Sequence, residues 1–140
     1  MLARLAFLLH AAIETPAAAT FLFAPHRQVS ATLLASATGG GAEVVLLLQN
    51  YGGLLASSVL LSLVMAAWSS PGHLRGLVAL ALGSYHLFPS RRALIRQTQR
   101  IGLQGPQGRT LGGPAVHLAV HVACFVALTS AGLQELLRDE

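Results

Sequence analysis

The chain has little charge, no lysine and a single cysteine, and each of these shortages narrows its class. Charged residues make up 10% of the 140 residues, whereas soluble domains carry about 25%. The basic residues are all arginines, and most of them lie in loops beside apolar segments. Lipid headgroups are therefore the expected partners, and no nucleic acid is expected. Cys124 alone excludes an internal disulfide and a thiolate metal cluster.

Motifs for cofactor chemistry are also missing from the chain. It has no dinucleotide fingerprint, no haem motif, no redox cysteine pair and no convincing nucleophile elbow. The glycines at positions 39–41 follow no predicted strand, and no phosphate-loop lysine accompanies them. We therefore expect no cofactor, and any chemistry must come from ordinary side chains.

Long apolar runs dominate what is present. Hydrophobic residues make up 54% of the chain, and crossing a bilayer takes about 20 of them in a row. Because backbone groups in lipid must be satisfied internally, we predict helices and no open sheet. The expected fold is an all-α polytopic membrane four-helix bundle that forms one transmembrane domain over residues 1–140. Its helices are predicted at residues 3–24, 42–68, 71–88 and 114–136, the third being the shortest.

The N-terminal segment resembles the start of a signal peptide, with a short charged region before an apolar run. His10 and Glu14 interrupt that apolar run, so we expect the first helix to be retained.

Arginines in the loops predict the orientation. Six of them lie in or beside the two loops at residues 25–41 and 90–113, and three lie on the opposite side. The positive-inside rule places these loops in the cytosol of a multi-pass membrane protein, which we expect in the endoplasmic reticulum. Within the second loop, residues 90–101 alternate arginines and apolar residues at helical spacing. This pattern predicts an amphipathic helix in the headgroup layer.

Glu14 is the most informative residue because it interrupts the first apolar run. A carboxylate at bilayer depth costs roughly 2.5–3.5 kcal/mol even on lenient insertion scales. Such residues face a bundle interior and mark a site. His10 lies one turn earlier on the same helix face. Pro16 removes the backbone hydrogen bond to the Ala12 carbonyl. A structural role for Glu14, hydrogen-bonded to a neighbouring helix, is the alternative.

Polar residues of all four predicted helices fall in the cytosolic half of the bundle. At about 1.5 Å per residue, Glu14, Asn50 and His121 lie about 10–15 Å from the cytosolic ends of their helices. We therefore predict that these three side chains face one internal cavity. The predicted catalytic set is Glu14, His10, Tyr85, His86 and His121, and the predicted substrate-binding set is Gln49, Asn50, Tyr51 and His117.

The i, i+4 spacing of His117 and His121 would allow both imidazoles to coordinate one zinc ion. No third ligand follows them at close spacing, so we expect no metal. Gln49 and Asn50 precede Gly52 and Gly53, where helices could approach closely, so a packing role for the two amides is equally open.

Four short motifs suggest a family. They are Glu14-Thr15-Pro16, Gln49-Asn50-Tyr51-Gly52-Gly53, Tyr85-His86 and the histidines of the last helix. In these motifs the chain resembles small four-helix integral membrane proteins from fungal biosynthetic clusters. Some of those proteins are assigned as epoxide hydrolases or cyclases in polyene-pyrone pathways. The resemblance implies a polyketide-like substrate and covers most of the chain.

A carboxyl, imidazoles, a phenol and amides in a dry cavity can do acid–base chemistry without a cofactor. We expect an enzyme that opens an epoxide, by hydrolysis or cyclisation, on an apolar polyketide or terpenoid-like substrate from the bilayer. Glu14 would deprotonate the nucleophile with His10 tuning it, and Tyr85, His86 or His121 would protonate the epoxide oxygen. Two alternatives remain: a double-bond isomerase using the same groups, and a non-enzymatic membrane subunit or small-molecule carrier. A homo-oligomer is also open.

Overall fold

A computed structural model gives the arrangement of the chain, and helices form all of its described secondary structure. They are α1 (Leu2–Phe23), the 3₁₀ turn η1 (Pro25–Gln28), α2 (Ala31–Leu34), α3 (Gly40–Ala67), α4 (His73–Tyr85), α5 (Leu87–Thr98) and α6 (Gly113–Leu136). The structure describes residues 1–29, 31–35, 40–68, 70, 72–100 and 112–138.

The predicted all-helical membrane bundle is confirmed. Helices α1, α3 and α6 are long and apolar enough to cross a bilayer. At most a third of the most apolar stretch of each is buried within the protein. Large apolar side chains such as Leu5, Leu54 and Val126 therefore face outward, as a lipid environment requires.

The most extensive helix–helix contact is between α1 and α3, and α6 packs against α1, α4 and α5. On α1 the buried residues Ala3, Phe7, His10, Glu14 and Ala18 recur every three or four positions and form one stripe. That spacing keeps them on one helix face. The two polar residues therefore lie on the face that packs into the bundle, and not on the lipid face.

Two apolar clusters lie above and below the polar residues of α1. One surrounds Phe7, Leu82 and Leu128, and the other joins Phe21 and Leu55. His10 and Glu14 fall between Phe7 and Phe21 along the helix. The first cluster joins α1, α3, α4 and α6, and the buried residues of the second join α1 to α3, so apolar packing flanks the polar layer on both sides.

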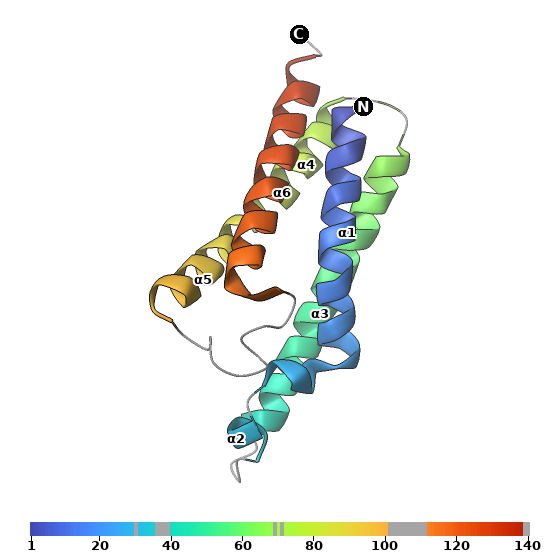
Figure 1. Cartoon of the computed structure of the whole chain (residues 1–140). Coiled ribbons are helices and arrows are strands. Elements are labelled where there is room, and N and C mark those ends of the chain that lie inside the picture. Colours follow the sequence, from blue (N-terminus) through green and yellow to red (C-terminus); the bar gives the residue numbers. More distant parts are fainter. Residues whose placement is uncertain (30, 36–39, 69, 71, 101–111, 139–140) are drawn as a thin grey trace.

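The predicted third span is shorter than expected. Helix α4 has 13 residues, or about 20 Å, whereas the bilayer core is about 30 Å thick. The chain breaks helical continuity at His86 and continues as α5. In Figure 1, α5 lies on the other side of α6 from α1 and α3.

The amphipathic segment predicted at residues 90–101 is a helix from Leu87 to Thr98. Residue 101 lies outside the described residues. The helix packs along α6 and buries Ala93. Two of its arginines, Arg92 and Arg96, line a cavity between the helices, which a helix lying only on headgroups would not explain. The predicted loop at residues 25–41 also contains short helical turns, η1 and α2.

Candidate functional site

Three buried imidazoles form a hydrogen-bonded row across the bundle. His10 Nδ1 lies 2.8 Å from His86 Nε2, and His86 Nδ1 lies 2.9 Å from His121 Nδ1. His10 comes from α1, His86 from the break between α4 and α5, and His121 from α6. The first hydrogen bond joins residues that are 76 positions apart in the sequence, and the second joins residues that are 35 positions apart.

Ser58 on α3 extends the row and indicates where the hydrogens lie. Its hydroxyl donates to the Leu55 carbonyl at 2.8 Å, and its oxygen lies 3.3 Å from His10 Nε2. The serine hydrogen is therefore in use, so His10 Nε2–H must be the donor in the second contact. His10 Nδ1 then accepts from His86 Nε2–H, which leaves His86 Nδ1 without a hydrogen.

Glu14 lies beside the junction of His86 and His121. Its Oε1 is 3.4 Å from His121 Nδ1 and 3.7 Å from His86 Nδ1, and its side chain is 1% exposed. This oxygen has no hydrogen-bond partner among the described residues. An unsatisfied buried acceptor costs about 1–3 kcal/mol. Binding of a ligand or a proton by Glu14 Oε1 would remove this cost.

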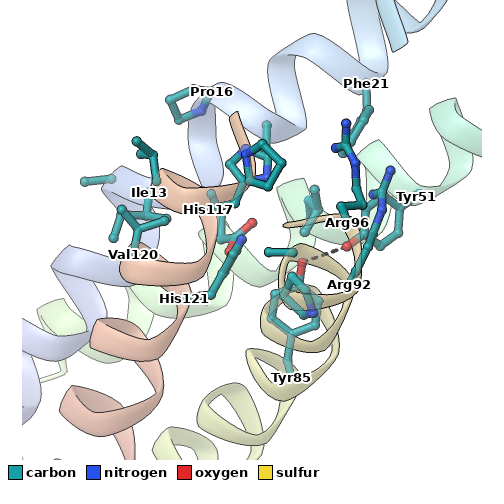
Figure 2. Close-up of a pocket in the computed structure, with 18 residues that line it drawn as sticks. Ile13, Pro16, Phe21, Tyr51, Tyr85, Arg92, Arg96, His117, Val120 and His121 are labelled. Atoms are coloured by element: carbon teal, nitrogen blue, oxygen red, sulfur yellow. Dashed lines mark hydrogen bonds and ion pairs between the residues drawn. The ribbon is translucent and has the colours of Figure 1, made fainter. Parts of the chain in front are cut away.

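A cavity of about 240 Å³ opens against this cluster. Its lining side chains, drawn in Figure 2, come from α1, α3, α4, α5 and α6. Its polar lining residues are Glu14, Tyr51, Tyr85, Arg92, Arg96, His117 and His121, and apolar side chains such as Ile13, Phe21, Leu55 and Val120 form most of the rest. His10 and His86 lie behind this wall.

Two phenols close one side of the cavity. Tyr51 Oη and Tyr85 Oη are 2.8 Å apart (Figure 2). The Tyr85 ring packs edge-on against His86, with 5.2 Å between ring centroids. Either hydroxyl can be the donor of this hydrogen bond, which fixes the position of both phenols at the cavity wall.

All five predicted catalytic residues are brought together. Glu14, His10, His86 and His121 form the cluster, and Tyr85 lines the same cavity as Glu14 and His121. Tyr51 and His117 of the predicted substrate-binding set also line it.

The two amides do not line the cavity. Asn50 is exposed on α3, so the prediction that it faces the cavity with Glu14 and His121 is wrong. One residue along a helix turns the side chain by about 100°, and Tyr51 takes the inward position. Gln49 donates from Nε2 to the Leu22 carbonyl at 3.4 Å, which ties α3 to α1.

Two features were missed from the sequence. Ser58 follows Tyr51 by seven residues, which places both on one helix face, so its spacing could have revealed it. Arg92 and Arg96 were assigned to lipid headgroups, but they line the cavity together with His117. Only the direction in which α5 leaves α4 decides this.

Three residues of the cluster could hold a metal ion. His10, Glu14 and His86 each offer one ligand atom within 4.8 Å of the others, and all three residues are buried. The pair that the sequence suggested for zinc, His117 and His121, has its ring centroids 6.0 Å apart, and His117 lies outside this group.

Fold and site define a helical membrane protein with a histidine–glutamate cluster beside an apolar cavity. No family model, curated protein or solved structure matches the chain. The resemblance to small fungal biosynthetic membrane proteins therefore stays a prediction.

Proposed function

We propose that the protein is a membrane-embedded enzyme that opens an epoxide on an apolar substrate, by hydrolysis or by cyclisation. The observation that supports this best is that Glu14, His121 and Tyr85 line one largely apolar cavity. A base on α1 and an acid on α4 that line one cavity suit a reaction in which one oxygen loses a proton and another gains one.

In hydrolysis, the oxygen of a water molecule bonds to an epoxide carbon while the carbon–oxygen bond of the ring breaks. Glu14 takes the proton of the attacking water, and Tyr85 gives its phenol proton to the ring oxygen. The proton on Glu14 then returns through a second water to the Tyr85 oxygen. In cyclisation, a hydroxyl of the substrate replaces the water and the proton transfers are the same.

Neighbouring residues support these two roles. Tyr51 hydrogen-bonds to Tyr85 and would stabilise the phenolate that forms during ring opening. His121 borders both Glu14 and the cavity, so its ring can orient the attacking oxygen. His10 and His86 lie behind and hold His121 in place.

The substrate class follows from the lining and the surroundings. Apolar side chains cover most of the cavity wall, and the three long helices expose apolar faces to lipid. A polyketide or terpenoid-like epoxide would enter from the bilayer, and membrane lipids would be the remaining partners. A homo-oligomer is compatible with the apolar outer faces.

Two other functions use the same geometry. A double-bond isomerase would move a proton between carbons with Glu14 and Tyr85. A non-enzymatic subunit or carrier would use the row His10–His86–His121 only to join α1, α4 and α6. The cavity lined by Glu14 and Tyr85 favours either enzyme over a purely structural row, which needs no cavity. The two reactions are separated by their product: a diol or cyclic ether from an epoxide, or a shifted double bond.

We also place the protein in the endoplasmic reticulum membrane, with residues 25–41 and 90–113 facing the cytosol. The support is the excess of arginines in and beside these segments.

Replacement of Glu14 by glutamine tests the proposal. The amide keeps the size of the side chain but cannot accept the proton, so turnover of an apolar epoxide should fall by about 10²–10⁴. Product would be measured in membranes containing the wild type or Glu14→Gln. Glu135→Gln is the matched control. Glu135 is also buried, but it lies near the start of α4, away from the cavity, where it accepts a hydrogen bond from the Gly72 N–H. Equal turnover by wild type and Glu14→Gln contradicts the acid–base role.

A further inference from the structure

Three potential ligand atoms converge beside the cavity. They are Glu14 Oε1, His86 Nδ1 and His121 Nδ1, and their separations are 2.9, 3.4 and 3.7 Å. A triangle with these sides has a centre about 2 Å from each corner, which is the length of zinc–nitrogen and zinc–oxygen bonds. One ion near this centre would contact all three atoms at bonding distance.

We propose that this corner binds one divalent transition-metal ion, of which zinc is the representative. Two imidazole nitrogens and one carboxylate oxygen make a ligand set that such ions accept. The inference shares Glu14 with the proposed function and rests on it only for the reaction that the ion would assist.

The unsatisfied Glu14 oxygen is the first independent support. Without an ion, the two facing Nδ1 atoms can share one hydrogen, and Glu14 Oε1 has no hydrogen-bond partner among the described residues. Its side chain is 1% exposed, so only a molecule or ion in the adjoining cavity could satisfy this oxygen. An ion would satisfy the carboxylate and both nitrogens at once.

The hydrogen-bond row is the second support. Ser58 requires a hydrogen on His10 Nε2, and His86 must then donate from Nε2 to His10 Nδ1. His86 Nδ1 is left with a lone pair that points at His121 Nδ1. Metal-binding histidines commonly donate their other N–H to a buried acceptor, which orients the ring. His10 and Ser58 have this supporting position.

The cavity gives the ion an open position. Glu14 and His121 both line it, whereas His86 lies behind. Three protein ligands plus one site for water or substrate is the arrangement of catalytic zinc, while structural zinc has four protein ligands. With the ion bound, Glu14 would be a ligand and the bound water would supply the nucleophile in place of a water deprotonated by the carboxylate.

Metal content tests the inference without any substrate. Protein purified without a polyhistidine tag would be stripped with a chelator, titrated with Zn²⁺ and analysed for bound zinc. We expect one ion per chain in the wild type and at least 100-fold weaker binding in Glu14→Gln and His121→Gln. His117→Gln is the matched control: His117 lies on the same helix and lines the same cavity, but it is not part of the triangle, so binding should be unchanged. His10→Gln should weaken binding by about 10–100-fold.

Cobalt gives a second readout that needs no variant. Co²⁺ bound by nitrogen and oxygen ligands in a distorted tetrahedral site should produce visible absorption bands that one equivalent of Zn²⁺ removes. Absence of both zinc binding and these bands in the wild type overturns the inference. So does equal zinc binding by folded Glu14→Gln and the control. A protein that binds zinc but opens no epoxide would support the metal site and refute the proposed reaction. A protein that opens an epoxide without bound metal would support the reaction and refute the metal site.

Discussion

At the scale of single residues, Ser58 contributes more to the structure of the site than its exposed neighbour Ser57. Ser58 Oγ provides the acceptor for His10 Nε2, while Ser57 Oγ donates to the Gly53 carbonyl of its own helix. Only the first of these contacts links two helices. The orientation of His10, and through it that of His86 and His121, therefore depends on one hydroxyl.

Removal of that hydroxyl should lower stability. Ser58→Ala leaves a buried imidazole N–H without an acceptor, which should reduce the free energy of unfolding by about 1–3 kcal/mol. Ser57→Ala serves as the control, because its hydroxyl is exposed and its loss should change stability by less than about 0.5 kcal/mol. Reversible unfolding in detergent would measure both. A Ser58→Ala protein as stable as the control would show that the row tolerates a missing link.

The two phenols of the cavity should differ in importance if Tyr85 is the acid. Tyr85→Phe removes the donated proton and should lower epoxide turnover by roughly 10²-fold or more. Tyr51→Phe removes only the hydrogen bond to Tyr85 and should cause a smaller loss. Steady-state rates on one substrate would compare them, and a larger loss in Tyr51→Phe would exchange their roles.

Depth along a helix was readable from the sequence, but rotation about its axis was not. Counting residues correctly brought Glu14 and His121 to one level, because each residue adds about 1.5 Å. The same count chose Asn50, which is exposed, whereas the adjacent Tyr51 lines the cavity. Helix α3 is apolar on nearly all sides, so its sequence gives no stripe from which to choose the inward face.

At the scale of the elements, Gly52 lets α1 and α3 approach closely. A Cβ atom added there would lie 2.9 Å from the Leu22 backbone nitrogen and 3.0 Å from Phe21 Cβ. The adjacent Gly53 has nothing within 4 Å of the same position. These two glycines therefore separate the effect of helix contact from that of helix propensity.

Alanine at each position gives opposite expectations. Gly52→Ala must push α1 away from α3 and should lower the free energy of unfolding by about 1–3 kcal/mol. Gly53→Ala adds a methyl group in open space and should raise it by up to about 1 kcal/mol through helix propensity. Unfolding in detergent would measure both proteins. Equal effects of the two substitutions would contradict the close approach of α1 and α3.

The short helix α4 explains why the cavity exists. Helix α4 ends at Tyr85, and α5 packs on α6 rather than on α1 or α3. The space that α4 would fill if it continued is therefore left for the cavity. The sequence predicted a helix at residues 71–88 and an amphipathic one after it. It did not predict the break at His86, since that histidine is in the last turn of the apolar run and no glycine marks an end there. The direction of α5 depends on packing against α6, which is a long-range contact.

At the scale of the whole molecule, the fold follows from the length and apolarity of the runs. Three runs long enough to cross a bilayer allow helices and exclude an open sheet, and the structure has those helices. Both ends of the described chain lie at the same end of the bundle as the connection between α3 and α4 (Figure 1). The turn η1 and helix α5, which contain four arginines, lie toward the other end (Figure 1). The proposed orientation puts that end in the cytosol.

Labelling of single cysteines should establish this orientation. In a Cys124→Ala background, which replaces the buried natural thiol, cysteines would be introduced by Arg27→Cys, Gln97→Cys and Ser70→Cys, all at exposed positions. A membrane-impermeant maleimide added to sealed, cytosol-side-out microsomes should label the first two proteins. Ser70→Cys should react only after detergent opens the vesicles, because it lies between α3 and α4 at the opposite end. The reverse pattern would invert the protein in the membrane without changing the fold. Labelling of all three from one side would mean that α3 does not cross the bilayer.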